Sequence, residues 1–268
     1  MQGTHRSPFV GYSVEFASHR EYVPGDDLRH VNWKLYARQK RLYVKEYDAE
    51  TNMNLYIYLD VSGSMECASN GLSKLAYGST LAAALAHLAI KQRDAVGLTL
   101  YADTILGHLP PKSKPHYLQE LTQLIATTSA RPVSDASRAL PPAVELAKHR
   151  GMVVIISDFF DDTEAIIRAI DNLRFRRHEV ILFHILDPWE RDLPADGVIR
   201  FQDMETGEEI VTRTEGIREE YLEAVEKWRN EIEEECLNRS VDRIEVTTDD
   251  PLDKVLVDYL AKRFKVGA

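Results

Sequence analysis

Apolar and polar residues fall into blocks along most of the chain, and the blocks have the lengths of strands and helices. Short, mainly apolar runs predict strands buried on both faces, and they lie at Met53–Leu59, Ala95–Tyr101, Met152–Ile156 and Glu179–Leu186. Longer segments with apolar residues at helical spacing lie between or beside them, at Leu72–Gln92, Pro115–Ala126, Ser137–His149 and Asp162–Phe175. Strands that alternate with helices predict an α/β domain with a doubly wound, mostly parallel sheet and helices on both faces.

The last third of the chain continues this pattern with smaller elements. A short strand at Thr104–Leu109 is expected beside Ala95–Tyr101. After residue 198 we expect a small strand pair, a long charged helix, a short strand and a final helix, at Val198–Gln202 with Glu209–Thr212, Ile217–Leu237, Arg243–Val246 and Leu252–Phe264. No low-complexity linker precedes them, so we expect residues 198–268 to pack on the same core.

The first 50 residues differ, because neither helical nor strand periodicity persists in them. A turn is expected at Pro24–Asp27, a short helix within Asp27–Ala37 and a strand at Arg41–Tyr47. We therefore divide the chain into an N-terminal segment, residues 1–52, packed on the core, and an α/β domain, residues 53–268.

Composition excludes several classes of protein. The chain has 33 Lys and Arg against 43 Asp and Glu, a net charge of −10, which argues against a general nucleic-acid or anionic-membrane binder. Neither a Walker motif nor Gly-x-Gly-x-x-Gly occurs, so we expect no ATP binding by this chain alone. The two cysteines, Cys67 and Cys236, give no disulfide framework. The start of the chain lacks an apolar core and Ser79–Ile90 is too short to span a bilayer, so we expect a cytoplasmic protein.

One motif carries candidate chemistry. Asp60, Ser62 and Ser64 form an Asp-x-Ser-x-Ser run directly after a predicted buried strand, and Asp158 follows another. In an open α/β sheet the carboxyl ends of adjacent strands meet in one crevice. If these two strands are neighbours, the two carboxylates repel each other unless a cation lies between them or one takes a proton. Carboxylate and hydroxyl oxygens suit a hard divalent cation, and an open position on it would accept a partner's carboxylate.

The run resembles the metal-ion-dependent adhesion site of von Willebrand factor A domains. The whole chain resembles, more specifically, the bacterial domain of unknown function 58 family, on the segments Gly3–Pro8, Gly11–Phe16, Arg20–Arg29, Asn32–Lys34, Ala37–Arg38, Val44–Lys45, Glu50–Asn52 and Ser157–Asp162. The resemblance implies one more hydroxyl ligand, at Ser134 before Asp135, with Ser137 as the alternative. The implied metal ligands are Asp60, Ser62, Ser64, Ser134 and Asp158.

The resemblance also implies a function. It implies a non-enzymatic protein-binding module that holds Mg²⁺, with Mn²⁺ or Ca²⁺ as alternatives, and binds an Asp or Glu of a partner. The implied partner is an ATPase of the MoxR class of AAA+ proteins, for which this chain would be an adaptor in protein assembly or maturation.

Two alternatives stay open. One is a metal-dependent hydrolase with Asp60 and Asp158 as ligands and a base from His5, His19 or His30. Against it, no Gly-x-Ser-x-Gly nucleophile motif is present. The other alternative is a scaffold whose metal site is degenerate. Asp161 and Asp162 are expected to cap the following helix.

Overall fold

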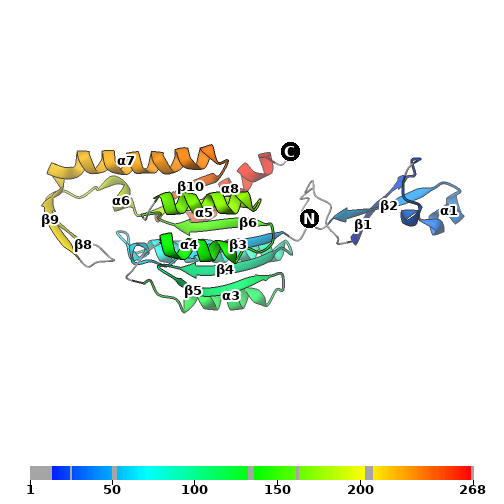
Figure 1. Cartoon of the computed structure of the whole chain (residues 1–268), viewed down its shortest axis with the longest axis horizontal. Helices are drawn as coiled ribbons and strands as arrows, with labels where there is room; N and C mark the ends of the chain where they lie inside the picture. Colours follow the sequence, from blue (N-terminus) through cyan, green and yellow to red (C-terminus); the bar gives the residue numbers. More distant parts are fainter. Residues whose placement is uncertain are drawn as a thin grey trace. The chain divides into compact units, whose positions relative to one another are not determined.

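The structure is a computed structural model that describes residues 14–24, 26–49, 53–131, 136–160, 163–202 and 208–266. The chain forms two compact units, residues 1–52 and 53–268 (Figure 1). Each unit is described by itself, and the packing of the first segment on the core stays a prediction.

The smaller unit is a two-stranded antiparallel sheet with short helices between its strands. β1 (Val14–Glu21) pairs with β2 (Tyr43–Ala49), and the 3₁₀ helix η1 (Leu28–His30) and α1 (Trp33–Gln39) lie between them in sequence. The helix and the second strand were predicted, whereas β1 was not. Its sequence, VEFASHRE, has no clear apolar alternation, and its partner strand lies more than twenty residues later. Local pattern therefore carried no signal for it.

The larger unit is built on a six-stranded sheet in the order β10-β7-β6-β3-β4-β5. The strands are β3 (Asn54–Asp60), β4 (Ala95–Tyr101), β5 (Ile105–Lys112), β6 (Met152–Ser157), β7 (Glu179–Leu186) and β10 (Asp242–Thr247). All neighbours are parallel except β4 and β5. This confirms the predicted α/β fold with a mostly parallel sheet.

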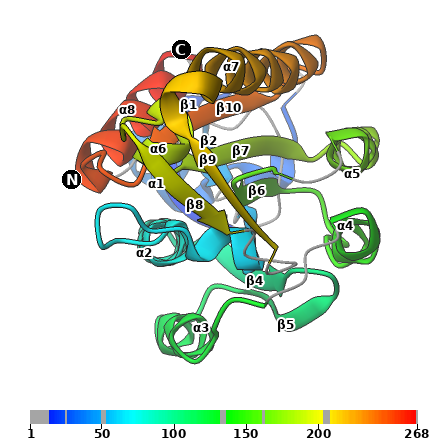
Figure 2. The ribbon, with the colours of Figure 1, turned by 90° about the vertical axis from the view of Figure 1, so that its left-hand side faces the viewer.

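Helices cover both faces of this sheet (Figure 2). One face packs against α2 (Lys74–Lys91), α3 (Tyr117–Ala126) and α8 (Leu252–Val266), and the other against α4 (Ala136–Glu145), α5 (Thr163–Phe175) and α7 (Thr214–Asn238). Every residue of β6 is buried, as are all of β3 and β4 but their first residues. Burial on two faces explains why these strands read as apolar runs and not as alternating patterns.

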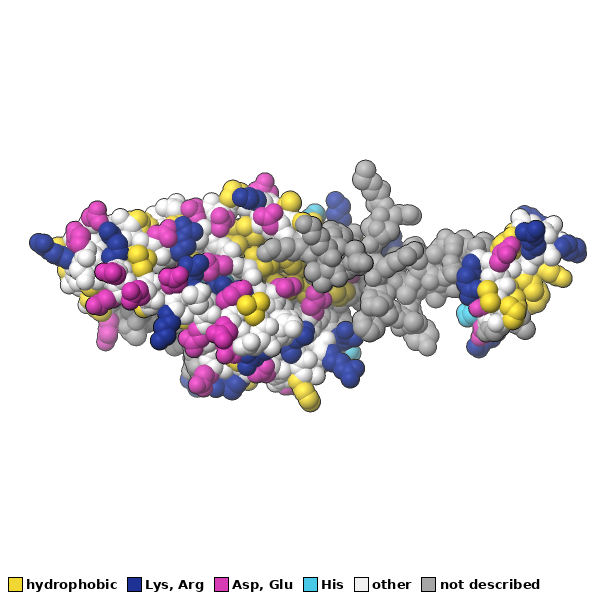
Figure 3. Space-filling view, turned by 90° about the horizontal axis from the view of Figure 1, so that it is seen from above, with side chains coloured by type: hydrophobic (Ala, Val, Ile, Leu, Met, Phe, Trp, Pro, Cys, Tyr) yellow, Lys and Arg dark blue, Asp and Glu magenta, His cyan; other side chains and the backbone are white. Residues whose placement is uncertain are grey.

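Smaller elements complete the larger unit at the carboxyl ends of the strands. The 3₁₀ helix η2 (Gly63–Glu66) follows β3, and the short helix α6 (Pro188–Asp192) follows β7. A separate antiparallel hairpin pairs β8 (Val198–Gln202) with β9 (Glu209–Arg213). None of the helices in the described part of the chain combines the length and the apolarity that a bilayer crossing requires. Acidic and basic side chains are interspersed on the face of this unit shown in Figure 3.

Several predicted boundaries were wrong for identifiable reasons. Leu72 lies outside α2 and is 41% exposed, because the Ser73 side chain caps the helix by accepting from the Ala76 N–H. β5 extends past Leu109 through two prolines, which an edge strand tolerates. α4 ends at Glu145, so Gly151 does not terminate it. A Cβ at Gly151 would lie 2.2 Å from the carbonyl oxygen of Asn54, so close approach of two strands requires the glycine.

Candidate functional site

Two carboxylates stand at the carboxyl ends of adjacent central strands. β3 pairs with β6, with Leu59 opposite Ile156, so Asp60 ends one strand and Asp158 directly follows the other. β3 also pairs with β4 on its other side. The chain therefore leaves β3 in one direction and returns to pair on its opposite side, which makes this a topological switch point, where open α/β sheets bind ligands.

Hydrogen-bond donors surround the Asp60 carboxylate. The Ser62 N–H donates to Oδ1 at 2.9 Å, and the Ser157 hydroxyl donates to Oδ2 at 2.6 Å. These bonds favour the charged form, but burial and the charge of Asp158 oppose it and raise the pKa of Asp60 to about 7. Without a nearby cation, the buried side chain thus holds a proton until near neutral pH.

The two serines of the motif lie side by side next to Asp60. Ser62 Oγ is 3.0 Å from Ser64 Oγ, and Ser62 is fully buried whereas Ser64 is half-buried. Backbone bonds hold their loop, since Val61 N–H donates to Tyr101 O and Arg131 N–H donates to Val61 O, both at 2.8 Å. The hydroxyls are therefore fixed at the carboxyl end of the central strand β3, as a coordination site requires.

A buried lysine occupies the Asp158 side of the site. Lys74, the first residue of α2, has no exposed surface, and its Nζ donates to Asp158 Oδ2 at 2.7 Å and to Glu190 Oε1 at 2.6 Å. Burial disfavours the ammonium ion, but the charges of Asp158 and Glu190 outweigh that effect and raise the pKa of Lys74. Asp158 is therefore paired with a protein cation, and Asp60 is not.

The lysine ties the site to α6. Glu190 and Asp187 form a capping box at the start of that helix: Asp187 accepts from the Trp189 N–H, and Glu190 accepts from the Asp187 N–H. The second oxygen of Asp187 accepts from the Ser69 N–H at 2.8 Å. Loops after β3 and β7 are thus joined through charged groups, with Lys74 between them.

Aromatic side chains form the wall beside Asp158. Phe160 is 44% exposed, stacks on Trp228 of α7 with ring centroids 4.5 Å apart, and lies 4.9 Å from the Lys74 ammonium. The Phe160 N–H also donates to Asp158 Oδ1 at 3.2 Å. The carboxylate is consequently oriented by its own loop while an apolar surface faces solvent next to it.

The remaining predicted ligands are not placed by the structure. Ser134, like Asp161 and Asp162, lies outside the described residues. Ser137 lies in the first turn of α4, and its side chain is outside the described part as well. The structure therefore brings together Asp60, Ser62, Ser64 and Asp158, and it leaves the choice between the two hydroxyl candidates open.

Sequence reasoning missed Lys74, Ser157 and Glu190. The sequence did contain a signal for the lysine. The N-terminal end of a helix is positive and therefore unfavourable for a cation. Lys74 directly follows the N-cap Ser73, so a carboxylate nearby is expected to compensate its charge. Ser157 belongs to the segment Ser157–Asp162 that resembles the family, but no role was predicted for it. Glu190 carries a recognisable capping-box pattern with Asp187, but nothing in the sequence connects it to Asp158.

The donor set fits a hard cation. Asp60, Ser62 and Ser64 offer a carboxylate and two hydroxyls in one loop, which are oxygen ligands that such a cation takes. In the described part of the chain, no group of three or more His, Cys, Asp or Glu side chains is arranged to hold a metal. An ion here would thus depend on the hydroxyls, as the Asp-x-Ser-x-Ser motif predicts.

Proteins of related sequence align with most of this chain. It is 27% identical over 212 residues to the uncharacterized proteins Rv1480 of Mycobacterium tuberculosis and Mb1516 of Mycobacterium bovis, covering 77% of this chain. The chain spans 66% of the length of each of these relatives.

Solved structures share the fold. An aerotolerance-related membrane protein from Bacteroides fragilis is similar with a TM-score of 0.51 and 19% identity, over 75% of this chain and 94% of that one. The VWA domain of SpRpn10 is similar at a TM-score of 0.44 and 11% identity, over 77% of this chain and 94% of that one.

A family model matches most of this chain. The model of the protein family of unknown function DUF58 matches residues 18–231, which include parts of both units, Asp60, Asp158 and most of α7. The resemblance to the domain of unknown function 58 family is confirmed, and this chain belongs to the DUF58 family.

Proposed function

We propose that this protein is a non-enzymatic binding module in which a divalent cation, Mg²⁺ first, links Asp60, Ser62 and Ser64 to an Asp or Glu of a partner protein. The observation that carries the proposal is the convergence of these oxygens with Asp158 at adjacent strand ends of the sheet. The partner's carboxylate would complete the coordination of the cation.

The charges at the site support a cation. Asp158 and Glu190 share the ammonium of Lys74, and Asp60 forms no ion pair with any residue that the structure describes. Burial is the main cause that raises the pKa of Asp60 and that of Glu190. The charge of Asp158 raises both pKa values further. A divalent cation at Asp60 would offset this negative excess, and it would keep Asp60 ionised below pH 7.

Nucleophilic catalysis has no support in the same geometry. A nucleophilic serine needs a base within hydrogen-bond reach. In the described residues of the larger unit, the hydrogen-bonding side chains around Ser62 and Ser64 are each other and Asp60, and no histidine is bonded to either. This geometry supports the proposal that the two serines act as oxygen ligands of a cation.

The proposed partner is an ATPase of the MoxR class, which the family resemblance implies. An acidic residue of that ATPase would reach the cation beside the exposed Phe160 ring. The chain would then act as an adaptor in the assembly or maturation of other proteins.

Calorimetric titration with Mg²⁺, Mn²⁺ and Ca²⁺ tests the cation. We expect wild type to bind at least one of them and Asp60→Asn to lose that binding at least a hundredfold. Asp103→Asn is the matched control, because Asp103 follows the neighbouring strand β4 in a turn and we expect it to bind as wild type. Equal binding by all three proteins, or none by wild type, would contradict the proposal.

One observation favours a rival function. Lys74 already supplies a positive charge to Asp158, as it would in a scaffold whose metal site has been replaced by an internal ion pair. In that case wild type would bind no divalent cation, and capture of partner proteins would be insensitive both to EDTA and to Asp60→Asn. Cation-dependent capture that Asp60→Asn abolishes would instead exclude the scaffold.

A further inference from the structure

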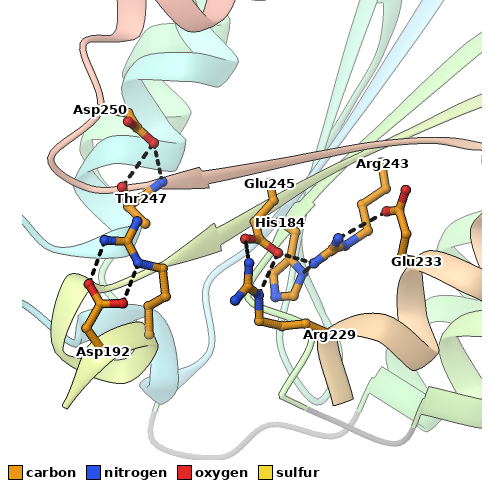
Figure 4. Close-up of polar contacts among 9 residues, drawn as sticks. His184, Asp192, Arg229, Glu233, Arg243, Glu245, Thr247 and Asp250 are labelled. Carbon is orange, nitrogen blue, oxygen red and sulfur yellow. Dashed lines mark hydrogen bonds and ion pairs between the residues drawn. The ribbon is translucent and has the colours of Figure 1, made fainter. Parts of the chain in front are cut away.

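The six-stranded sheet ends in a strand whose outer edge is unpaired. β10 pairs with β7 on one side, and no strand in the described part of the chain lies on its other side. The Thr248 N–H donates to Leu186 O in β7, whereas the Thr247 N–H donates to the Asp250 carboxylate at 2.8 Å (Figure 4). Successive amides of a strand point in opposite directions. The odd-numbered amides of β10 therefore face outward.

Two of the outward residues offer backbone groups to another chain. Arg243 and Glu245 direct their N–H and C=O groups away from β7, and within the described residues no backbone partner is found for them on that side. Thr247, the third, is capped by Asp250. An edge with free donors and acceptors at alternate residues is a template for an added strand.

A groove runs along this edge on the side of α8. Its volume is about 230 Å³, and its apolar lining includes Ile244, Val246, Val255 and Tyr259. The side chains of Arg243 and Glu245 lie on the opposite side of the strand, where they pair with each other and with Glu233 and Arg229 of α7 (Figure 4). Side chains of an added strand would thus alternate between an apolar groove and a charged helix surface.

The charges around the groove are mainly negative. Asp250 and Asp258 line it against Lys254. Asp258 is exposed, and it forms no ion pair with any residue that the structure describes. An occupant with basic side chains is therefore favoured over an acidic one.

We propose that β10 and α8 form a second binding surface, which takes an extended basic and apolar segment of a partner protein as an added strand. The backbone of the segment pairs with Arg243 and Glu245, and alternate apolar side chains enter the groove against Val255 and Tyr259. This surface lies on the edge strand, two strands away from β6 and Asp158 in the sheet order, so it does not depend on a cation at Asp60.

Fluorescence anisotropy with the full chain tests the surface, using a labelled eight-residue peptide of alternating lysine and valine as the probe. We expect saturable binding that falls at least tenfold when lysine is replaced by glutamate in the peptide. Val255→Lys should also lower the affinity at least tenfold. Val257→Lys is its control, because Val257 lies on the same helix, 63% exposed and outside the groove.

A milder pair of variants keeps the test valid if Val255→Lys does not fold. Asp258→Asn should weaken binding about threefold, while Asp253→Asn, in the first turn of the same helix, should not. Hydrogen exchange adds a direct readout: the peptide should slow exchange at the Arg243 and Glu245 amides at least tenfold. The Ile244 and Val246 amides, which face β7, should already be protected in the free protein.

Three results would overturn the proposal. The first is no binding of the lysine–valine peptide at millimolar concentration. The second is binding that the Val255 and Asp258 variants leave unchanged, or that leaves the Arg243 and Glu245 amides unprotected. The third is self-association of the chain that Val255→Lys abolishes, because it would assign the edge to a second copy.

Discussion

Asp60 and Asp158 are two buried carboxylates at neighbouring strand ends, and their surroundings are opposite. Asp158 accepts from the Lys74 ammonium, whereas the donors to Asp60 among the described residues are neutral: the Ser62 N–H and the hydroxyls of Ser157 and Ser62. One carboxylate thus has its counter-charge inside the protein, and the other lacks one. A cation at this site would therefore supply the counter-charge that Asp60 lacks, because Asp158 already has the Lys74 ammonium.

The strongest way to break this comparison is to remove the lysine. Lys74→Met leaves Asp158 and Glu190 buried without a counter-charge, so we expect the free energy of unfolding to fall by about 3–5 kcal/mol. Urea denaturation measures it. Lys91→Met, at the exposed other end of the same helix, should change stability by less than about 1 kcal/mol. A Lys74→Met protein as stable as wild type would show that the ion pair contributes nothing.

Neutralising each carboxylate in turn sharpens the comparison. Asp158→Asn leaves the buried Lys74 with one carboxylate fewer, and we expect a loss of about 2–3 kcal/mol. Asp60→Asn removes a buried charge that has no cation beside it, so we expect no loss of stability in the absence of metal. Denaturation of both variants with EDTA at pH 8 measures the difference. Equal losses would mean that the two carboxylates are balanced in the same way.

Asp60 also makes the stability of the folded protein depend on pH. Its pKa is raised from 3.8 to about 7, so between these values the folded protein holds a proton that the unfolded chain has lost. Metal-free stability should therefore fall as pH rises from about 4 to about 7 and then level off. The difference between wild type and Asp60→Asn in EDTA isolates this dependence.

Cation binding should show the opposite trend. Because the ion requires ionised Asp60, its affinity should rise up to about pH 7, a change that calorimetry measures. An affinity that is flat over this range would contradict the raised pKa.

The sheet was largely predictable because strands that are buried on both faces have sequences that are continuous apolar runs. Met152–Ile156 and Glu179–Leu186 coincide with β6 and β7 to within one residue. Elements whose stability comes from distant partners were not predictable. β1, for example, depends on a strand more than twenty residues away.

The site, like the fold, was predictable only in part. Asp60 and Asp158 could be placed together because a parallel sheet brings its strand ends to one edge. Lys74 and Glu190 are separated by 116 residues, and their contact depends on how α2 and α6 pack at that edge. No local pattern encodes such a contact, although the lysine at a helix N-terminus indicates that one must exist.

The order of the strands sets when this site can form during synthesis. The Asp-x-Ser-x-Ser run leaves the ribosome before β6 does, and β3 gains this neighbour only after almost one hundred further residues. Glu190, which shares the lysine, follows later still. A nascent chain therefore presents the serines without the second carboxylate, and only a chain with a completed central sheet can present a binding-competent surface to a partner.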